Sequence, residues 1–140
     1  MRAVVDPNVL VSAVISPAGP PAAIVGAWTE DRFELVISVQ LLDELSEVLS
    51  RDKFRRWIDA DSAAEYVAAL AEAATTLDDP PSAPKSSPDP DDDYLIALAR
   101  AASADFLVSG DGDLTRLADP DPPVLTPREF LDRLDNADSS

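Results

Sequence analysis

Carboxylates stand at or just after the ends of the apolar segments that are expected to form strands. Asp6 follows the run Arg2–Val5, and Asp111 and Asp113 follow the run Asp105–Ser109. Oxygen ligands of this kind suit hard divalent cations such as Mg²⁺ and Mn²⁺. Such ions acidify a water molecule, orient it toward a phosphodiester and stabilise the charge that develops on the phosphate. The residue types therefore indicate metal-assisted hydrolysis.

The chain lacks the two residue types that most often supply general bases, nucleophiles or zinc ligands. Among its 140 residues there is no histidine and no cysteine. Disulfides, thiolate metal sites and Ser-His or Cys-His arrangements are therefore excluded. Catalysis would have to use carboxylates, hydroxyls, lysine, arginine or a bound metal ion.

Apolar periodicity and capping signals predict strands that alternate with helices. The expected strands are Arg2–Val5, Phe33–Val39, Asp105–Ser109 and Pro123–Leu125. The expected helices are Pro7–Ile15, Pro21–Trp28, Gln40–Ser50 with a continuation over Asp52–Ile58, Asp61–Leu77, Asp91–Ala99 and a last helix after the cap at Thr126. Residues 78–90 are expected to form a loop. This alternation predicts a parallel sheet with helices on both faces.

Two further acids are expected at the same edge of the sheet as Asp6 and Asp111. Functional groups of an open α/β sheet gather beyond the carboxyl ends of the strands. Asp93 starts the helix that leads into the third strand, and Glu44 lies in the helix that follows the second strand. Four segments far apart in the sequence thus direct carboxylates to one place. A cation there would offset their mutual repulsion.

Each of these acids also has a purely structural interpretation. Asp6 could serve only as a helix cap, Glu44 could be a solvated helix residue, and Asp91–Asp93 could favour a helix dipole. Asp111 and Asp113 could belong to a turn without chemistry. Taken alone, each structural interpretation is the more common one. The joint placement at one edge is what favours a metal site.

The overall charge argues against a nucleic-acid partner. Twenty-seven acidic residues against eleven basic ones give a formal net charge of −16, and a field of that sign repels polyanions. One basic cluster stands beside Phe54 and Trp57, and it could guide RNA, bind an acidic segment of a partner, or be an ordinary solvated helix face. Its members are Arg51, Lys53, Arg55 and Arg56.

Five segments resemble PIN-domain proteins, in particular the bacterial and archaeal toxin–antitoxin branch that includes VapC-type ribonucleases. They follow the family's order and span almost the whole chain. The segments are Val4–Val9, Leu41–Leu49, Asp89–Ala99, Asp105–Leu114 and Leu125–Leu131. The resemblance implies a PIN-like three-layer α/β/α domain with a central, mainly parallel sheet.

The resemblance also implies an Mg²⁺-dependent endoribonuclease, with Mn²⁺ as a substitute, that acts as a homodimer and is held inactive by a cognate antitoxin. Carried over by position, the catalytic acids, which also hold the metal, are Asp6, Glu44, Asp93 and Asp111. Asp113 matches a supporting acid, and Asp92 is an alternative to Asp93 as ligand. Asn8 and Ser109 match small polar positions that orient carboxylates or water beside the metal.

Three features depart from the family's pattern. Pro7 replaces the usual hydroxyl residue, and Gly112 stands where a basic residue is common. The segment 78–88 matches poorly the strand that is often found there. These departures bear on efficiency and substrate choice more than on the fold.

Two other functions are compatible with the sequence. An aspartate-based phosphatase would use Asp6 as nucleophile, but such enzymes need a second aspartate where this chain has Asn8. A receiver-like domain would need a lysine after a strand, and neither Lys53 nor Lys85 is placed so. A PIN-like fold kept as a non-catalytic binding or assembly module would suit the net charge if its partner were basic.

The length of the chain fits one domain. We expect that domain over residues 1–135, followed by a short frayed tail at 136–140. No apolar segment is long enough to cross a bilayer, and the first residues do not resemble a signal peptide. The sequence therefore predicts a cytoplasmic protein without a membrane partner.

Overall fold

The computed structural model describes residues 1–78, 90–116 and 120–138, with the backbone alone at 90–93, 113 and 138. At its centre is a five-stranded sheet in which every neighbouring pair is parallel. The strand order is β3–β2–β1–β4–β5. The strands are β1 Arg2–Val5, β2 Glu34–Ile37, β3 Thr75–Thr76, β4 Phe106–Val108 and β5 Val124–Leu125.

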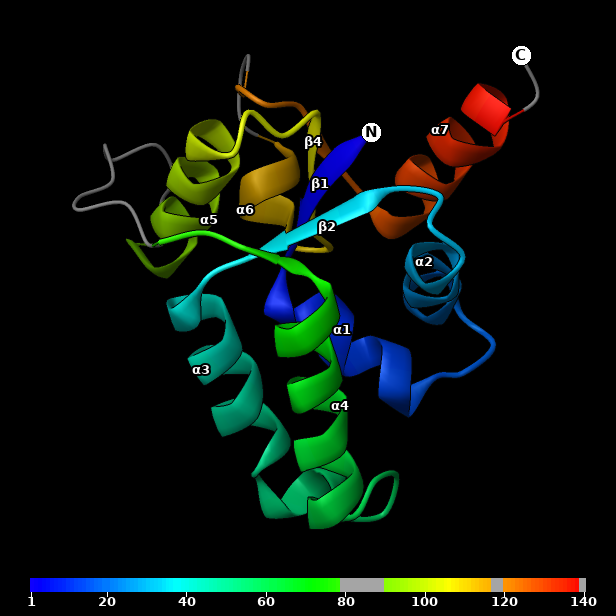
Figure 1. The fold of residues 1–140 in the computed structure, drawn as a ribbon, viewed down its shortest axis with the longest axis vertical. Coiled ribbons are helices and arrows are strands. Elements are labelled where there is room, and N and C mark those ends of the chain that lie inside the picture. Colours follow the sequence, from blue (N-terminus) through cyan, green and yellow to red (C-terminus); the bar gives the residue numbers. More distant parts are fainter. Residues whose placement is uncertain (79–89, 117–119, 139–140) are drawn as a thin grey trace.

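Helices surround this sheet in the layers that the sequence predicts (Figure 1). Helix α5 lies on one side of the strands, whereas α2 and α7 lie on the other, and α3 and α4 form a hairpin that extends away from the sheet. The helices are α1 Pro7–Ile15, α2 Pro20–Thr29, α3 Val39–Leu49, α4 Ala60–Ala73, α5 Pro90–Ala101, α6 Gly112–Thr115 and α7 Pro127–Asp138, with the 3₁₀ turn η1 at Asp52–Phe54. The predicted three-layer α/β/α architecture with a parallel sheet is confirmed.

The register of the sheet decides which residues meet at its carboxyl edge. Val5 of β1 lies beside Val108 of β4, so these two strands end at the same level. The next residues, Asp6 and Ser109, therefore leave the sheet side by side. Because β1 is the middle strand, this pair lies at the centre of the edge.

Apolar residues hold the layers together around the strands. Ala3, Val4 and Val5 of β1 are at most 1% exposed, as expected for a parallel strand covered on both faces. On the side of α7, Phe130 packs edge-on against Phe33, with ring centroids 5.0 Å apart. The strands that carry the acids therefore belong to one continuous core.

Side-chain caps fix where several helices begin. The Oγ of Ser38 accepts a hydrogen bond from the amide of Leu41 at the start of α3. Thr126 and Glu129 form a reciprocal pair at the start of α7, as the sequence predicts. The start of α4 is corrected, because the cap is Asp59, which accepts from the amide of Ser62, and the helix begins at Ala60 rather than at Asp61.

Two predicted helical segments are wrong in extent. The segment expected to be helical over Asp52–Ile58 contains only the 3₁₀ turn η1, because the backbone is extended at Arg51. The helix expected over Asp61–Leu77 ends at Ala73, since Ala74 is extended and Thr75–Thr76 pair with β2 as the strand β3. Threonine favours strands, and this short edge strand was missed.

Two smaller elements also differ from expectation. The turn expected after β4 contains the short helix α6. Helix α7 continues to Asp138, so residues 136–138 are helical where a frayed tail is predicted. The division into a domain over residues 1–135 and a tail stays a prediction. No single helix within the described ranges is long and apolar enough to span a membrane, although α1 and α2 would pass that test together as a bent pair.

Candidate active site

Asp6 is the central carboxylate of the candidate site. It follows β1 directly, and its amide donates a hydrogen bond to the carbonyl of Val108 at the end of β4. Its Oδ1 accepts from the amide of Asn8, 2.9 Å away, which caps the first turn of α1. The residue is only 4% exposed. Asp6 therefore caps a helix, as its structural interpretation predicts. Only Oδ1 takes part in the cap, and Oδ2 has a different partner.

Ser109 is the hydrogen-bond partner of the second carboxylate oxygen of Asp6. Its hydroxyl donates to Oδ2 of Asp6 over 2.9 Å, and its Oγ accepts from the amide of Asp111 over 3.0 Å. Ser109 is fully buried. One hydroxyl thus joins the end of β1 to the turn that carries Asp111, and it fixes the orientation of Asp6.

The environment of Asp6 disfavours its charged form. Burial raises the pKa of the Asp6 carboxyl above its ordinary value. The hydrogen bonds from Asn8 and Ser109 lower this pKa in part, and the nearby charge of Asp111 raises it further. A carboxylate in such a place is stabilised by a cation beside it.

A cavity of about 450 Å³ opens next to Asp6. The predicted residues Asn8 and Asp111 line it with Asp6, and Asn8 is exposed to solvent. Its other lining residues, which the sequence did not single out, are Val9, Ser12, Pro21, Gly110 and Pro127. The structure thus brings Asp6, Asn8 and Asp111 together around a space that a substrate could enter.

Glu44 is placed through a tyrosine that sequence reasoning missed. The hydroxyl of Tyr94, in α5, donates to Oε2 of Glu44, in α3, over 2.8 Å. Tyr94 is only 9% exposed, so its hydroxyl needs a protein partner. This contact ties Glu44 to the helical turn that also carries Asp93, the residue that precedes Tyr94. The sequence signal that could have identified Tyr94 is its place directly after the acids Asp91–Asp93 at the start of an apolar helix.

The remaining predicted acids have side chains outside the described residues. Asp92 and Asp93 lie in the first turn of α5, and Asp113 lies in α6. Among the side chains that the structure does describe, no group of three acids comes close enough to hold a metal ion. The full predicted ligand set is therefore not tested by the described contacts.

The donor chemistry of the described part nevertheless fits Mg²⁺ or Mn²⁺. Asp6 and Asp111 share the cavity, and Asp111 raises the pKa of the buried Asp6 carboxyl. Both offer only oxygen, and the chain has no histidine or cysteine to favour zinc. A hard divalent cation would relieve the repulsion between the two carboxylates.

A comparison with protein families decides what kind of domain carries this site. Residues 2–113 match the family model described as PIN domain. This chain is a PIN-domain protein. PIN domains are generally nucleases, which hydrolyse phosphodiester bonds.

Relatives of this PIN domain cover nearly its whole length. The uncharacterized protein MJ1680 of Methanocaldococcus jannaschii is 24% identical over 144 residues, covering 96% of this chain and 92% of the relative. The crystal structure of PAE2754 from Pyrobaculum aerophilum superposes with a TM-score of 0.67 at 17% identity, covering 97% and 96% of the two chains.

A second similar structure contains a DNA fragment. VapBC2 from Rickettsia felis, bound to a DNA fragment from their promoter, superposes on this PIN domain with a TM-score of 0.62 at 14% identity. The match covers 90% of this chain and 98% of the other. At these identities the two crystal structures show a shared fold.

Arg116 supplies a cation near the acids of this PIN domain. A Cβ placed on Gly112 would lie 3.2 Å from Cζ of Arg116, so the guanidinium of Arg116 fills the space beside the glycine. Gly112 directly follows Asp111. At the position where the family resemblance leads us to expect a basic residue, the guanidinium of Arg116, four residues further along the chain, lies against the glycine.

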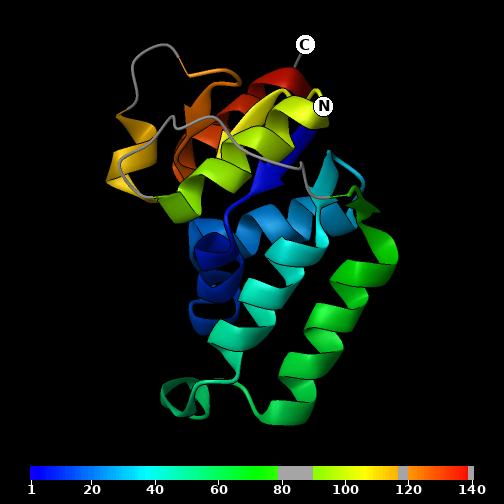
Figure 2. The same ribbon diagram turned by 90° about the vertical axis from the view of Figure 1, so that its left-hand side faces the viewer.

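The predicted basic cluster lies elsewhere on the PIN domain. Its residues follow the last turn of α3, at the end of the hairpin that is remote from the sheet (Figure 2). Arg51 forms an ion pair with Glu47 over 2.9 Å, and Arg55 donates to the carbonyls of Leu49 and Ile58. The structure thus separates this cluster from the cavity beside Asp6.

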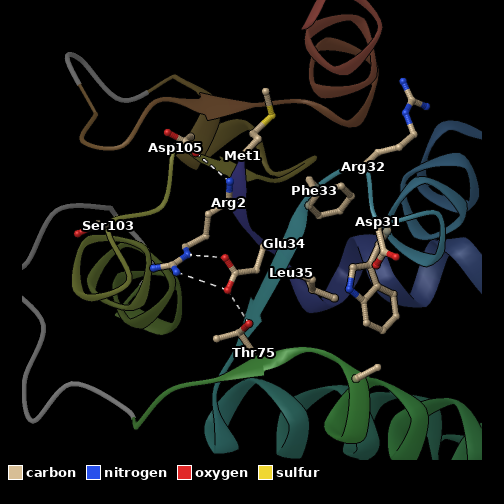
Figure 3. A pocket seen from close by; sticks show the side chains of 12 residues that line it. Met1, Arg2, Asp31, Arg32, Phe33, Glu34, Leu35, Thr75, Ser103 and Asp105 are labelled. Atoms are coloured by element: carbon tan, nitrogen blue, oxygen red, sulfur yellow. Dashed lines mark hydrogen bonds and ion pairs between the residues drawn. The ribbon is translucent and has the colours of Figure 1, made fainter. Parts of the chain in front are cut away.

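A second cavity, of about 560 Å³, opens at the amino ends of the strands (Figure 3). There the guanidinium of Arg2 pairs with Glu34, and Oε1 of Glu34 accepts from the hydroxyl of Thr75. The backbone amide of Arg2 donates to Asp105. These polar side chains form hydrogen bonds and an ion pair with one another across neighbouring strands. Their role at the amino edge of the sheet is therefore structural.

Proposed function

We propose that this PIN domain is an endoribonuclease that depends on Mg²⁺, with Mn²⁺ as a substitute, and hydrolyses phosphodiester bonds. The observation that carries the proposal is the buried Asp6 carboxylate, which two hydrogen bonds orient beside Asp111 and the 450 Å³ cavity. Holding a desolvated acid in this way costs free energy that a bound cation offsets. The family's general nuclease activity supports the same function.

The acids of the carboxyl edge would hold the metal. We assign Asp6, Glu44, Asp93 and Asp111 as ligands or catalytic acids, with Asp113 as a supporting acid and Asp92 as the alternative to Asp93. When bound, the ion supplies acidity to a water molecule and stabilises charge on the scissile phosphate.

The protein's own residues prepare the site for that ion. Ser109 and the amide of Asn8 hold Asp6 in one orientation, and Tyr94 holds Glu44. Arg116, whose guanidinium lies beside Gly112, is placed to contact a phosphate of the RNA. Such a contact would offset part of the repulsion between a chain of net charge −16 and a polyanion.

The geometry disfavours a phosphatase that uses Asp6 as nucleophile. Both oxygens of Asp6 already accept hydrogen bonds, and the side chain is only 4% exposed. Attack on phosphorus would require an incoming phosphate to reach this buried carboxylate, and Asn8 stands where such enzymes need a second aspartate.

The proposal also covers the protein partners of this PIN domain and the cell compartment in which it works. The shared fold with VapBC2 and the family resemblance support a toxin role, in which a cognate antitoxin keeps the nuclease inactive. We further propose a homodimer that works in the cytoplasm. Size-exclusion chromatography with light scattering on the purified protein, alone and with a candidate antitoxin, would test both the complex and the dimer.

The decisive experiment measures cleavage of a mixed RNA pool by the purified protein. Mg²⁺, Mn²⁺ and a chelator are compared, with Asp6→Asn and Asp93→Asn as variants and Ser12→Ala, in the same cavity, as the matched control. We expect cleavage that needs metal, is lost in both aspartate variants and persists in the control. Metal-dependent binding of RNA without cleavage under every condition would instead support a binding module.

A further inference from the structure

An exposed tryptophan marks the end of the α3–α4 hairpin. Trp57 is 46% exposed, whereas large hydrophobic side chains are normally buried. Among the described residues, the other exposed large hydrophobic side chains are Met1 and Val39. Neither lies in this segment, so Trp57 is a single aromatic surface and not part of an extended apolar patch.

Two cations accompany the aromatic rings at this end. The guanidinium carbon of Arg56 lies 4.9 Å from the ring centroid of Trp57, and Nζ of Lys53 lies 5.1 Å from that of Phe54. Neither Arg56 nor Lys53 has a hydrogen bond or ion pair to another described residue. Their charges are therefore available to an incoming anion.

The other two basic residues of the cluster hold the segment in place. Arg55 donates to the carbonyl of Leu49 over 2.6 Å and to that of Ile58 over 3.0 Å. Phe54 is only 8% exposed, and its ring lies 6.3 Å from that of Trp57. With Arg51 paired to Glu47, the cluster divides into anchors, Arg51 and Arg55, and outward-facing groups, Lys53, Arg56 and Trp57.

The outward-facing groups match the chemistry of single-stranded nucleic acid. A rigid aromatic ring stacks on a base, and neighbouring cations contact the backbone phosphates. The described residues around Trp57 form no exposed apolar patch of the kind that marks many protein–protein interfaces. The chain as a whole carries a charge of −16, and Asp52 and Asp59 are exposed in this segment, so Lys53 and Arg56 are the groups here that can contact a phosphate.

The position of these groups suits an RNA that also reaches the candidate active site. Helix α3 carries Glu44 and ends just before this segment, and its eleven residues span about 16 Å. Figure 2 shows two segments on the same side of the molecule. One is the turn with η1, and the other is helix α6, which follows Asp111. A strand several nucleotides long could therefore contact both.

We propose that Lys53, Arg56 and Trp57 form a docking site for single-stranded RNA, at which Trp57 stacks on a base and the two cations bind adjacent phosphates. This inference rests on the proposed function for its RNA substrate. It adds that substrate preference depends on length, because only an RNA that extends beyond the cleavage site reaches Trp57.

Binding is tested without cleavage, in chelator. The probe is a fluorescently labelled oligoadenylate RNA of about 16 nucleotides, compared with one of about 4 nucleotides. We expect Trp57→Ala and Arg56→Ala to weaken binding of the long RNA about tenfold, and the short RNA to bind the unaltered protein more weakly than the long one because it cannot reach both sites. Arg56→Ala should also reduce the salt dependence of binding by about one phosphate contact. Arg51→Ala, which removes the same charge from a paired residue, is the matched control.

The outcomes separate this inference from the proposed nuclease. Unchanged affinity of the long RNA in both Trp57→Ala and Arg56→Ala overturns the docking site, even if the protein cleaves RNA, and leaves this end of the hairpin to a protein partner. Equal loss in Arg51→Ala overturns it as well, because overall charge would then explain the effect. RNA binding that depends on Trp57 in a protein without nuclease activity supports the docking site and removes the proposed function.

Discussion

The hydroxyl of Ser109 lies 2.9 Å from Oδ2 of Asp6, although 103 positions separate the two residues in the chain. The contact exists because β1 and β4 are neighbours in register and end at the same level. It leaves the carboxylate of Asp6 oriented by donors on both oxygens. Asp6 is thereby presented to a ligand in a fixed direction.

Loss of this hydroxyl should weaken both metal binding and folding. Ser109→Ala removes the donor to Oδ2 of Asp6, and partners of this kind typically contribute about 10- to 100-fold to metal affinity or activity. The unfolding free energy should fall by about 1–3 kcal/mol, because Asp6 and the amide of Asp111 each lose a buried partner. Titration calorimetry with Mn²⁺ measures the affinity, and Ser12→Ala is the control. An unchanged Mn²⁺ affinity in Ser109→Ala would contradict the role assigned to this hydroxyl.

Mg²⁺ should stabilise the unaltered protein more than Asp6→Asn. Burial raises the pKa of Asp6, so ionisation of this group opposes folding as the pH rises through its folded value. Asparagine removes that charge, keeps an acceptor for the amide of Asn8 and offers a donor to Ser109. In chelator near pH 7 the variant should therefore melt no lower than the unaltered protein. Ligand binding to the folded state raises the melting temperature, so added Mg²⁺ should reverse the order. Equal Mg²⁺-induced shifts in a thermal melt would argue against Asp6 as a ligand.

Tyr94→Phe should reduce nuclease activity by releasing Glu44. The variant removes one hydrogen bond of 2.8 Å and leaves the buried ring in place. Tyr66→Phe is a closely matched control, because the hydroxyl of Tyr66 donates over 3.0 Å to the carbonyl of Leu10 instead of to Glu44. Both variants should lose about 1 kcal/mol of unfolding free energy, but only Tyr94→Phe should lower kcat. An equal effect on kcat in the two variants would mean that Tyr94 acts through stability alone.

The arrangement of strands was predictable because buried parallel strands have a strong signature. The apolar run of β1 ends at Asp6, and its alternation with helices predicted a parallel sheet whose carboxyl edge gathers acids. The proximity of Asp6, Asn8 and Asp111 follows from that topology. The direct bond from Ser109 to Asp6 does not, because it depends on the register between β1 and β4, which no local pattern encodes.

Elements governed by tertiary contacts escaped prediction. The strand β3 has only two residues, and pairing with β2 defines it more than its own sequence does. The sequence pattern after α3 predicts a helix. In the structure the side chain of Arg55 instead donates to the carbonyl of Leu49, the last residue of α3, and the chain turns there. In the sequence, Arg55 and Arg56 are two adjacent positive charges that cannot be told apart. Only the folded structure shows that Arg55 donates to backbone carbonyls and anchors the segment.

That difference predicts unequal effects of two adjacent substitutions on stability. Arg55→Ala leaves the carbonyls of Leu49 and Ile58 without their guanidinium donor and should lower the unfolding free energy by about 1–3 kcal/mol. Arg56→Ala removes an exposed side chain and should change it by less than about 0.5 kcal/mol. Urea denaturation followed by circular dichroism measures both. Equal losses would refute the division of the cluster into anchors and outward-facing groups.

Acid should destabilise the protein partly through Glu34, at the edge of the sheet opposite the candidate active site. Hydrogen bonds from Thr75 and then from Arg2 hold the pKa of the Glu34 carboxyl below its ordinary value of 4.5. A lowered folded pKa means that the unfolded chain takes up the proton first as the pH falls. The stabilisation is therefore complete above about pH 4.5 and is lost as the pH falls through the folded pKa. Glu34→Gln should reduce the dependence of unfolding free energy on pH in this acidic range, measured by urea denaturation. Glu72→Gln, on the exposed face of α4, controls for loss of a carboxylate, and an identical pH dependence in both variants would show that the contacts of Glu34 do not act as described.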